Sequence, residues 1–174
     1  VTDGDICAHG QATITTVTGG TVTACDQATV TAAAGGTITA TDNATITTVT
    51  GGTVDALEQA TITTVTDGDI CAHGQATITT VTGGTVTACD QATVTAAAGG
   101  TITATDDATI TAVSDNAHIT AHGNAQVIIE AGAGGVCVDA YDAAHITAHS
   151  GTITIHSPDV TVTNNGDAVI RHAS

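Results

Sequence analysis

The sequence of 174 residues has almost no large apolar side chains. It contains one aromatic residue, Tyr141, one leucine, Leu57, and no methionine, tryptophan or phenylalanine. A core must therefore consist of valine, isoleucine, alanine and threonine, whose short and mostly β-branched side chains suit a thin layer between strands. This composition excludes an ordinary globular core and predicts a narrow all-β fold.

Basic residues and long apolar runs are also scarce. Seventeen acids stand against one base, Arg171, and the formal net charge is −16. Such a surface repels phosphate backbones and anionic lipid, so we expect neither a nucleic-acid partner nor a membrane partner. The sequence shows no run of about 18 apolar residues and no leader-like segment, so neither a transmembrane helix nor a signal peptide is visible, and the cellular location stays open.

The dominant pattern is a repeat of eight residues. Valine or isoleucine recurs at this spacing fourteen times, from Ile6 to Ile110, usually between two threonines. This alternation predicts β-strands in which the apolar residue and the small residue two positions earlier point inward. The small residue alternates between glycine and alanine, so the complete unit has sixteen residues and two unlike strands.

An internal duplication supports the same unit. Residues 1–42 recur without change as residues 65–106, an offset of 64 residues or four units. Repeats of this kind predict a β-solenoid (parallel β-helix), here a flattened two-sheet rod of about ten coils with two eight-residue strands per coil. Residues 1–114 form its regular part, and residues 115–174 continue it as irregular coils and a cap.

Beyond Ile110 the repeat loosens. The core positions that we predict there are Ile119, Val127, Cys137, Ile146, Ile153, Val162 and Ile170. Terminal coils have to cover an open core and an unpaired strand edge, so irregular spacing is expected. The same open edges make edge-to-edge or end-to-end self-association an alternative to a monomer.

Two kinds of corner separate the strands. One is mostly Gly-Gly, where a tight reversal requires positive φ. The other carries an acid or glycine before an amide or acid, and its stacked Gln and Asn side chains are expected to form an amide ladder. The acids of this corner are Asp26, Asp42, Glu58, Asp90 and Asp106. They make calcium a minor alternative, but their spacing departs from the GGxGxDxUx pattern of calcium-binding solenoids, so we expect no metal.

The cysteines and histidines give no strong signal for chemistry. Cys7 and Cys71, like Cys25 and Cys89, are equivalent positions about 19 Å apart at about 4.8 Å per coil, so we expect free thiols. The two histidines within each AHITAH segment lie about 13 Å apart along a strand. His122 and His156 are two coils apart, so we interpret the histidines as solvated or capping residues.

No motif for nucleophilic catalysis, phosphate binding or redox chemistry is present in the sequence. We therefore expect neither an enzyme nor a cofactor.

Threonines form the most regular outward feature. One sheet presents two threonines per strand in seven successive coils: Thr13, Thr15, Thr29, Thr31, Thr45, Thr47, Thr61, Thr63, Thr77, Thr79, Thr93, Thr95, Thr109 and Thr111. The other sheet is interrupted by Asp5, Cys7, Asp55, Asp69, Cys71 and His118. Only the first sheet therefore carries an uncharged array.

On a flat sheet the hydroxyls of one strand lie about 6.6 to 7 Å apart and coils repeat at about 4.7 to 4.9 Å, which approaches a repeat in the oxygen lattice of ice. In this array, residues 11–111 resemble the Thr-x-Thr β-solenoid antifreeze proteins of insects, and the sixteen-residue period resembles bacterial ice-nucleation repeats. The resemblance implies non-catalytic binding of ice or ordered water through the fourteen threonines. The alternative is a structural scaffold, such as a segment of a bacterial or phage surface fibre, because threonine is also a good exposed strand residue.

Overall fold

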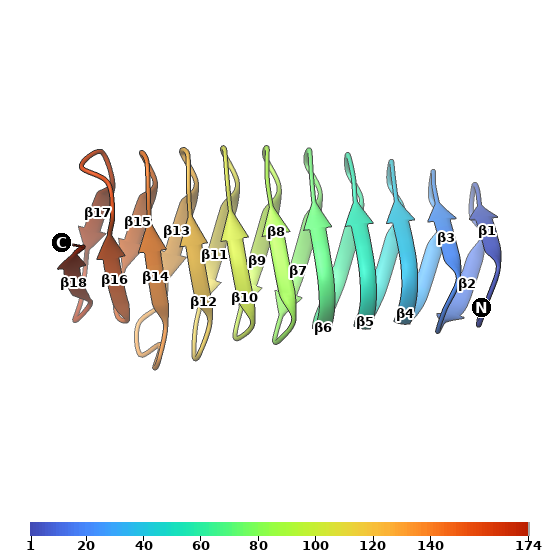
Figure 1. Ribbon diagram of the computed structural model, residues 1–174, viewed down its shortest axis with the longest axis horizontal. Helices are drawn as coiled ribbons and strands as arrows, with labels where there is room; N and C mark the ends of the chain where they lie inside the picture. The colour runs from blue at the N-terminus through green and yellow to red at the C-terminus, as the bar shows by residue number, and fades with distance from the viewer. Residues whose placement is uncertain (174) are drawn as a thin grey trace.

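The computed structural model describes residues 1–173 and consists of strands stacked into one rod (Figure 1). It has 18 strands, of which β4 (Thr29–Ala40), β5 (Thr45–Ala56) and β6 (Thr61–Ala72) each run along two sides of a coil. Counting each of these three as two segments gives 21 segments, or about ten coils. The predicted β-solenoid is confirmed, while Ser174 of the predicted C-terminal part lies outside the described residues.

The other strands are shorter than the predicted eight residues, with four or five residues each. One side of the rod contains β2 (Thr13–Val17), β7 (Thr77–Val81), β9 (Thr93–Ala97), β11 (Thr109–Val113), β13 (Gln126–Ile129), β15 (His145–Ala148) and β17 (Thr161–Asn164). The other side contains β1 (Asp5–Ala8), β3 (Thr21–Ala24), β8 (Thr85–Ala88), β10 (Thr101–Ala104), β12 (His118–Ala121), β14 (Cys137–Ala140), β16 (Thr152–Ile155) and β18 (Val169–His172).

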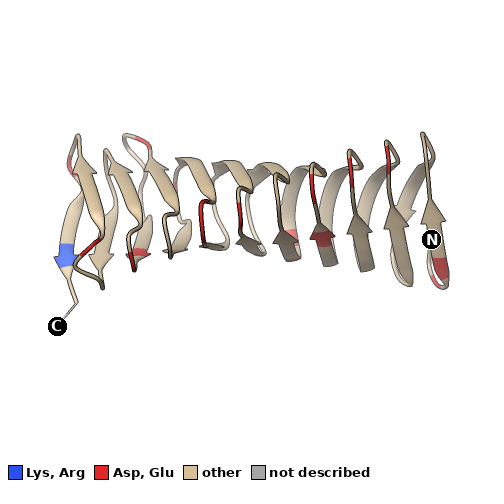
Figure 2. Ribbon diagram, turned by 90° about the horizontal axis from the view of Figure 1, so that it is seen from above, with Lys and Arg blue, Asp and Glu red and all other residues tan. Residues whose placement is uncertain are grey.

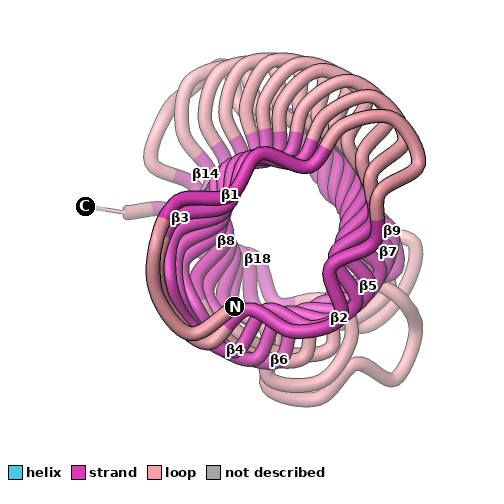
Figure 3. Tube along the Cα trace, turned by 90° about the vertical axis from the view of Figure 1, so that its right-hand side faces the viewer, coloured by secondary structure: helices cyan, strands magenta, loops and turns pink. Residues whose placement is uncertain are grey.

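The strands pair in parallel with the equivalent strand of the next coil. In the regular part the register is sixteen residues, so that Ile46 pairs with Val30 on one side and with Ile62 on the other. Seen along the rod, the strand backbone continues around one corner, and the opposite corners project as a row of loops (Figure 3). Because coil length is constant, like side chains lie above one another in columns.

The core contains alanine, valine and isoleucine, and no polar residue is buried in the described chain. From Val22 to Ile110 the predicted inward positions are correct for alanine and the central apolar residue, as at Ala44 and Ile46. The prediction was wrong for the glycines of this pattern, which are half-buried at the corners, and for Ile6, which is 37% exposed in the first coil. In the regular coils each segment adds a third buried residue that the sequence pattern did not predict. On one side it follows the central residue by three positions, as at Val49, and on the other by two, as at Ala56.

Glycine is required at the Gly-Gly corners, here called the glycine corners. Gly52 has a φ of 84°, and a Cβ atom there would lie 2.6 Å from the carbonyl oxygen of Gly36 in the preceding coil. The chain therefore has no room for a side chain between successive coils at this position.

The opposite corners, here called the acidic corners, are tight turns. The amide of Ala44 donates to the carbonyl of Thr41 at 3.0 Å, and Asp42 has a φ of 57°. Asp is one of the few residues other than glycine that tolerate this left-handed region. The column therefore carries either an acid or a glycine in each coil because its backbone requires a positive φ.

The C-terminal coils correct one predicted core position. Cys137 is exposed, and Val138 is buried in its place and pairs with Ile119 and Ile153. An irregular loop between β13 and β14 shifts the inward and outward alternation by one residue. In the last strand, Ile170 remains 38% exposed because a strand covers it on one side only.

Candidate functional site

The fourteen predicted threonines lie on one side of the rod, on β2, β7, β9, β11 and the first halves of β4 to β6; this surface is here called the threonine face. Its first column contains one threonine per coil. The column runs through seven directly paired residues: Thr13, Thr29, Thr45, Thr61, Thr77, Thr93 and Thr109. The next residue in register is Gln126, so the column ends at β11.

The second column is less regular than the first. Thr47 has no ladder partner, and Thr48, the next residue, also points outward before the buried Val49. Two consecutive outward residues interrupt the strand alternation, while the register with the neighbouring coils is kept, as at Thr48 with Ala32 and Thr64. The threonine face is therefore regular in its first column and irregular in its second.

Nearly all of these hydroxyls are available to water. Among residues 1–173, the hydroxyl of Thr111 donates to the carbonyl of Thr95 at 2.7 Å, and it is the one member of the fourteen that donates to a protein atom. Threonines beside the glycine corners behave differently, since Thr66 donates to the carbonyl of Val49 at 3.2 Å. Those corner threonines stabilise coil stacking, whereas the face threonines other than Thr111 do not use their hydroxyls in the fold.

The opposite surface, here called the mixed face, is paired more regularly, but other residue types interrupt its threonine columns. All four residues of each strand pair in register there, as for Thr37 with Thr21 and Thr53. Asp69 follows Thr53 in the first column, and Asp55 and Cys71 interrupt the second. The prediction that charged residues interrupt the sheet opposite the threonine face is therefore confirmed.

The acids of the acidic corners accept hydrogen bonds from backbone amides of neighbouring coils. The carboxylate of Asp26 accepts a hydrogen bond from the amide of Gly10 at 3.0 Å, and that of Asp42 accepts one from the amide of Asp26 at 3.2 Å. The acids recur along the corner loops, and the single base lies near the C-terminal end (Figure 2). Among the described residues, no group of three or more His, Cys, Asp or Glu side chains could hold a metal ion.

The predicted amide ladder was wrong within residues 1–173: the amide of Asn124 donates to the carboxylate of Asp107 at 3.2 Å, and no two amide side chains of this column bond to each other. The glutamines of this column form no side-chain hydrogen bonds to one another in that range. The corner is therefore held by its backbone and by the acids rather than by stacked amides.

The C-terminal histidines join a network that the sequence did not predict. Asp139 lies 3.6 Å from Nε2 of His118 and 3.1 Å from Nε2 of His156. Tyr141 stacks between His122 and His156, with ring centroids 4.6 and 4.3 Å apart. The predicted two-coil separation of His122 and His156 is thus correct, and an aromatic ring fills it.

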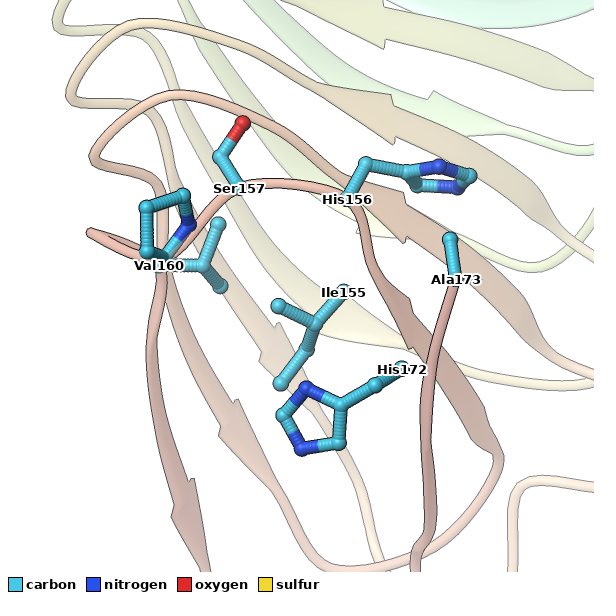
Figure 4. A pocket seen from close by; sticks show the side chains of 7 residues that line it. Ile155, His156, Ser157, Val160, His172 and Ala173 are labelled. Atoms are coloured by element: carbon cyan, nitrogen blue, oxygen red, sulfur yellow. The ribbon is translucent and has the colours of Figure 1, made fainter.

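A hollow of about 200 Å³ lies beneath the last coil. Ile155 and His172 extend side by side in it, whereas His156 points away toward the neighbouring coil (Figure 4). Ser157 at its rim donates no hydrogen bond to either histidine within the described residues. The hollow therefore assembles no nucleophile with a base.

The five cysteines are free thiols, as expected. Two of them contact histidines, which the sequence analysis did not predict. Sγ of Cys25 lies 2.9 Å from Nδ1 of His9, and Sγ of Cys89 lies 2.9 Å from Nδ1 of His73. Burial, and after it the carboxylate of Asp90, raises the pKa of the Cys89 thiol. The signal was present in the sequence, because sixteen residues, one coil, separate each histidine from its cysteine.

Comparisons with protein-family models, curated proteins and solved structures found no match to this chain. In residues 1–173 no helix is long and apolar enough to cross a membrane. The geometry of the surface is therefore the basis for assigning a function.

Proposed function

We propose that the protein is a non-catalytic ice-binding protein that adsorbs to ice or ordered water through the threonine face. The observation that supports this most is the first column, in which seven threonines pair directly without a charged residue between them. At about 4.8 Å per coil this column extends over about 29 Å. A regular array of that length can contact many lattice positions at once.

The side chain of threonine suits ordered water for two reasons. Its β-branching restricts χ1, so holding the hydroxyls in register costs little conformational entropy. Its methyl group excludes disordered water, while the hydroxyl forms hydrogen bonds to water held between the columns. The face threonines leave their hydroxyls free for this role, apart from the donor Thr111.

A structural scaffold is the second candidate function. It is favoured by the irregular second column, where Thr47 and Thr48 point outward together, and by the threonines that also occupy the mixed face. In a scaffold these residues serve the strands alone. The two candidates differ because only ice binding depends on which face carries a substitution.

Thermal hysteresis of matched lysine variants tests the proposal. Thr61→Lys places a charge in the middle of the first column of the threonine face, and Thr37→Lys places the same charge on the mixed face. We expect a freezing gap with faceted ice crystals from the parent chain and from Thr37→Lys, and loss of most of the gap in Thr61→Lys. Circular dichroism should show the same β spectrum for all three chains.

A third variant, Thr47→Lys, measures the role of the second column. A loss as large as that of Thr61→Lys would assign both columns to the ice surface, and a small loss would assign the first column alone. Round crystals and no gap from the parent chain at millimolar concentration would remove ice binding and leave the scaffold.

A further inference from the structure

Two histidines each face a cysteine thiol of the next coil at the start of an acidic corner. Nδ1 of His9 lies 2.9 Å from Sγ of Cys25, and the same atoms of His73 and Cys89 are separated by the same distance. The two pairs occupy equivalent positions of the duplicated segment. The four residues follow the mixed-face strands β1, β3, β6 and β8, and none of them belongs to the threonine face.

We propose that each pair is a two-coordinate binding site for a soft monovalent cation, Cu(I) or Ag(I). A thiolate sulfur and an imidazole nitrogen are ligands that such cations favour. With bond lengths like those of zinc, about 2.1 Å to nitrogen and about 2.3 Å to sulfur, a linear arrangement places the donors about 4.4 Å apart. The two side chains must therefore rotate to widen the present separation of 2.9 Å before the cation enters between the two coils.

The number of donors selects the class of cation. Structural zinc sites use four protein ligands in a tetrahedron. Among the described residues, no group of three or more His, Cys, Asp or Glu side chains could hold a metal. Two donors on adjacent coils therefore satisfy only an ion that accepts linear coordination, which hard divalent cations do not.

The surrounding charge favours a cation over an anion. Asp26 and Asp42 lie near the Cys25 thiol, and Asp90 and Asp106 lie near the Cys89 thiol; each acid adds to the effect of burial in raising the thiol pKa. The same negative field attracts a positive ion from solution. On binding, the S–H bond breaks, the S–metal bond forms and the proton passes to the solvent, with no electron transferred.

Silver titration of a chain that retains only the paired thiols tests this site. Serine replaces Cys7, Cys71 and Cys137, so that silver held by a lone thiol does not contribute. We add Ag(I) in the presence of a competing small monothiol, count bound silver by native mass spectrometry and follow the ¹⁵N shifts of the imidazoles. The expected result is two silver ions per chain, with the Nδ1 signals of His9 and His73 both displaced.

Two further variants separate imidazole coordination from simple thiol binding. In that chain, His73→Ala should lower the silver affinity of one of the two sites at least about tenfold. His145→Ala is the control, because His145 is exposed and pairs with Gln126 and Thr161 rather than with a cysteine. Equal silver affinity in the two variants, or bound silver with unchanged imidazole signals, would overturn the proposal. Neither result depends on activity toward ice.

Discussion

The regular coils and the C-terminal coils share one parallel ladder but differ in their outward side chains. From β2 to β11 the threonine face repeats one residue type, and one of its fourteen hydroxyls donates to a protein atom. From β12 to β18 several outward and corner positions carry ionisable or aromatic groups that contact one another. There Asp139 bridges His118 and His156, and Tyr141 stacks between two imidazoles.

Coil length accounts for this difference. In the regular part every coil has sixteen residues, so identical corners stack and the backbone spacing alone aligns them. In the C-terminal part, residue 118 pairs with residue 137 and residue 137 with residue 152, so successive coils have 19 and 15 residues. The parallel ladder still continues through these coils, and the amide of Ala143 donates to the carbonyl of Gly123 across one acidic corner. Because the coil length varies, however, unlike side chains meet between neighbouring coils, and some of them form specific pairs.

The largest effect should come from filling a stacked glycine corner. In Gly52→Ala the new Cβ lies 2.6 Å from the Gly36 carbonyl oxygen, and the neighbouring backbone cannot yield without opening the stack. We expect a loss of about 4 kcal/mol or more in the free energy of unfolding, measured by urea titration.

The matched control for this corner is Gly132→Ala in the C-terminal part. Gly132 has a φ of 78° but no heavy atom within 4 Å of an added Cβ. It should lose only the cost of left-handed backbone, about 1 to 2 kcal/mol. Equal losses in the two variants would show that coil stacking is not what requires Gly52.

A smaller effect should come from the core. Ile62 is fully buried between two coils, whereas Ile170 in the last strand is 38% exposed. Ile62→Ala should cost about 3 kcal/mol, and Ile170→Ala less than about 1 kcal/mol, because the removed methyl groups leave a cavity only in the first case. Thermal unfolding of the two variants measures the difference, which would vanish if the last coil were packed as tightly as the regular ones.

The smallest effect should come from the aromatic stack. Tyr141→Ala removes two ring contacts in the C-terminal part and should cost about 1 kcal/mol there. Amide hydrogen exchange should become faster in β14 and β16 and stay unchanged in β5. Tyr141→Phe keeps the ring and should leave exchange as it is, and a Phe variant as fast as the Ala variant would assign the effect to the hydroxyl instead.

Most of the fold could be predicted because strand alternation and a constant repeat are both written in the order of residues. The positions from Ile6 to Ile110 predicted the coil length and the side of the rod on which each threonine lies, and the seven looser positions after Ile110 completed the prediction of about ten coils. The extra buried residues, such as Val49, were missed because alternation was extended through a strand that contains two consecutive outward residues. Cys137 was misplaced because a loop of irregular length precedes it.

The candidate site was predicted in part for the same reason. The first column of the threonine face follows from the sixteen-residue spacing, and the register of Thr61 with its neighbours could be counted in advance. The irregularity at Thr47 could not, because it depends on how the strand turns into the glycine corner. His9 and Cys25 are one period apart, so the period places them on adjacent coils, but it does not predict that their side chains meet.

The sequence by itself determined the coil, its parallel stacking and the face that carries no charge, because a repeat of constant length leaves one register in which every apolar residue is buried. The tertiary structure decided which polar side chains of different coils meet. Those contacts depend on the lengths of all intervening corners, and a single added residue moves every later pair. Tyr141 therefore lies between His122 and His156 because of the lengths of two successive coils, which no short stretch of the sequence specifies.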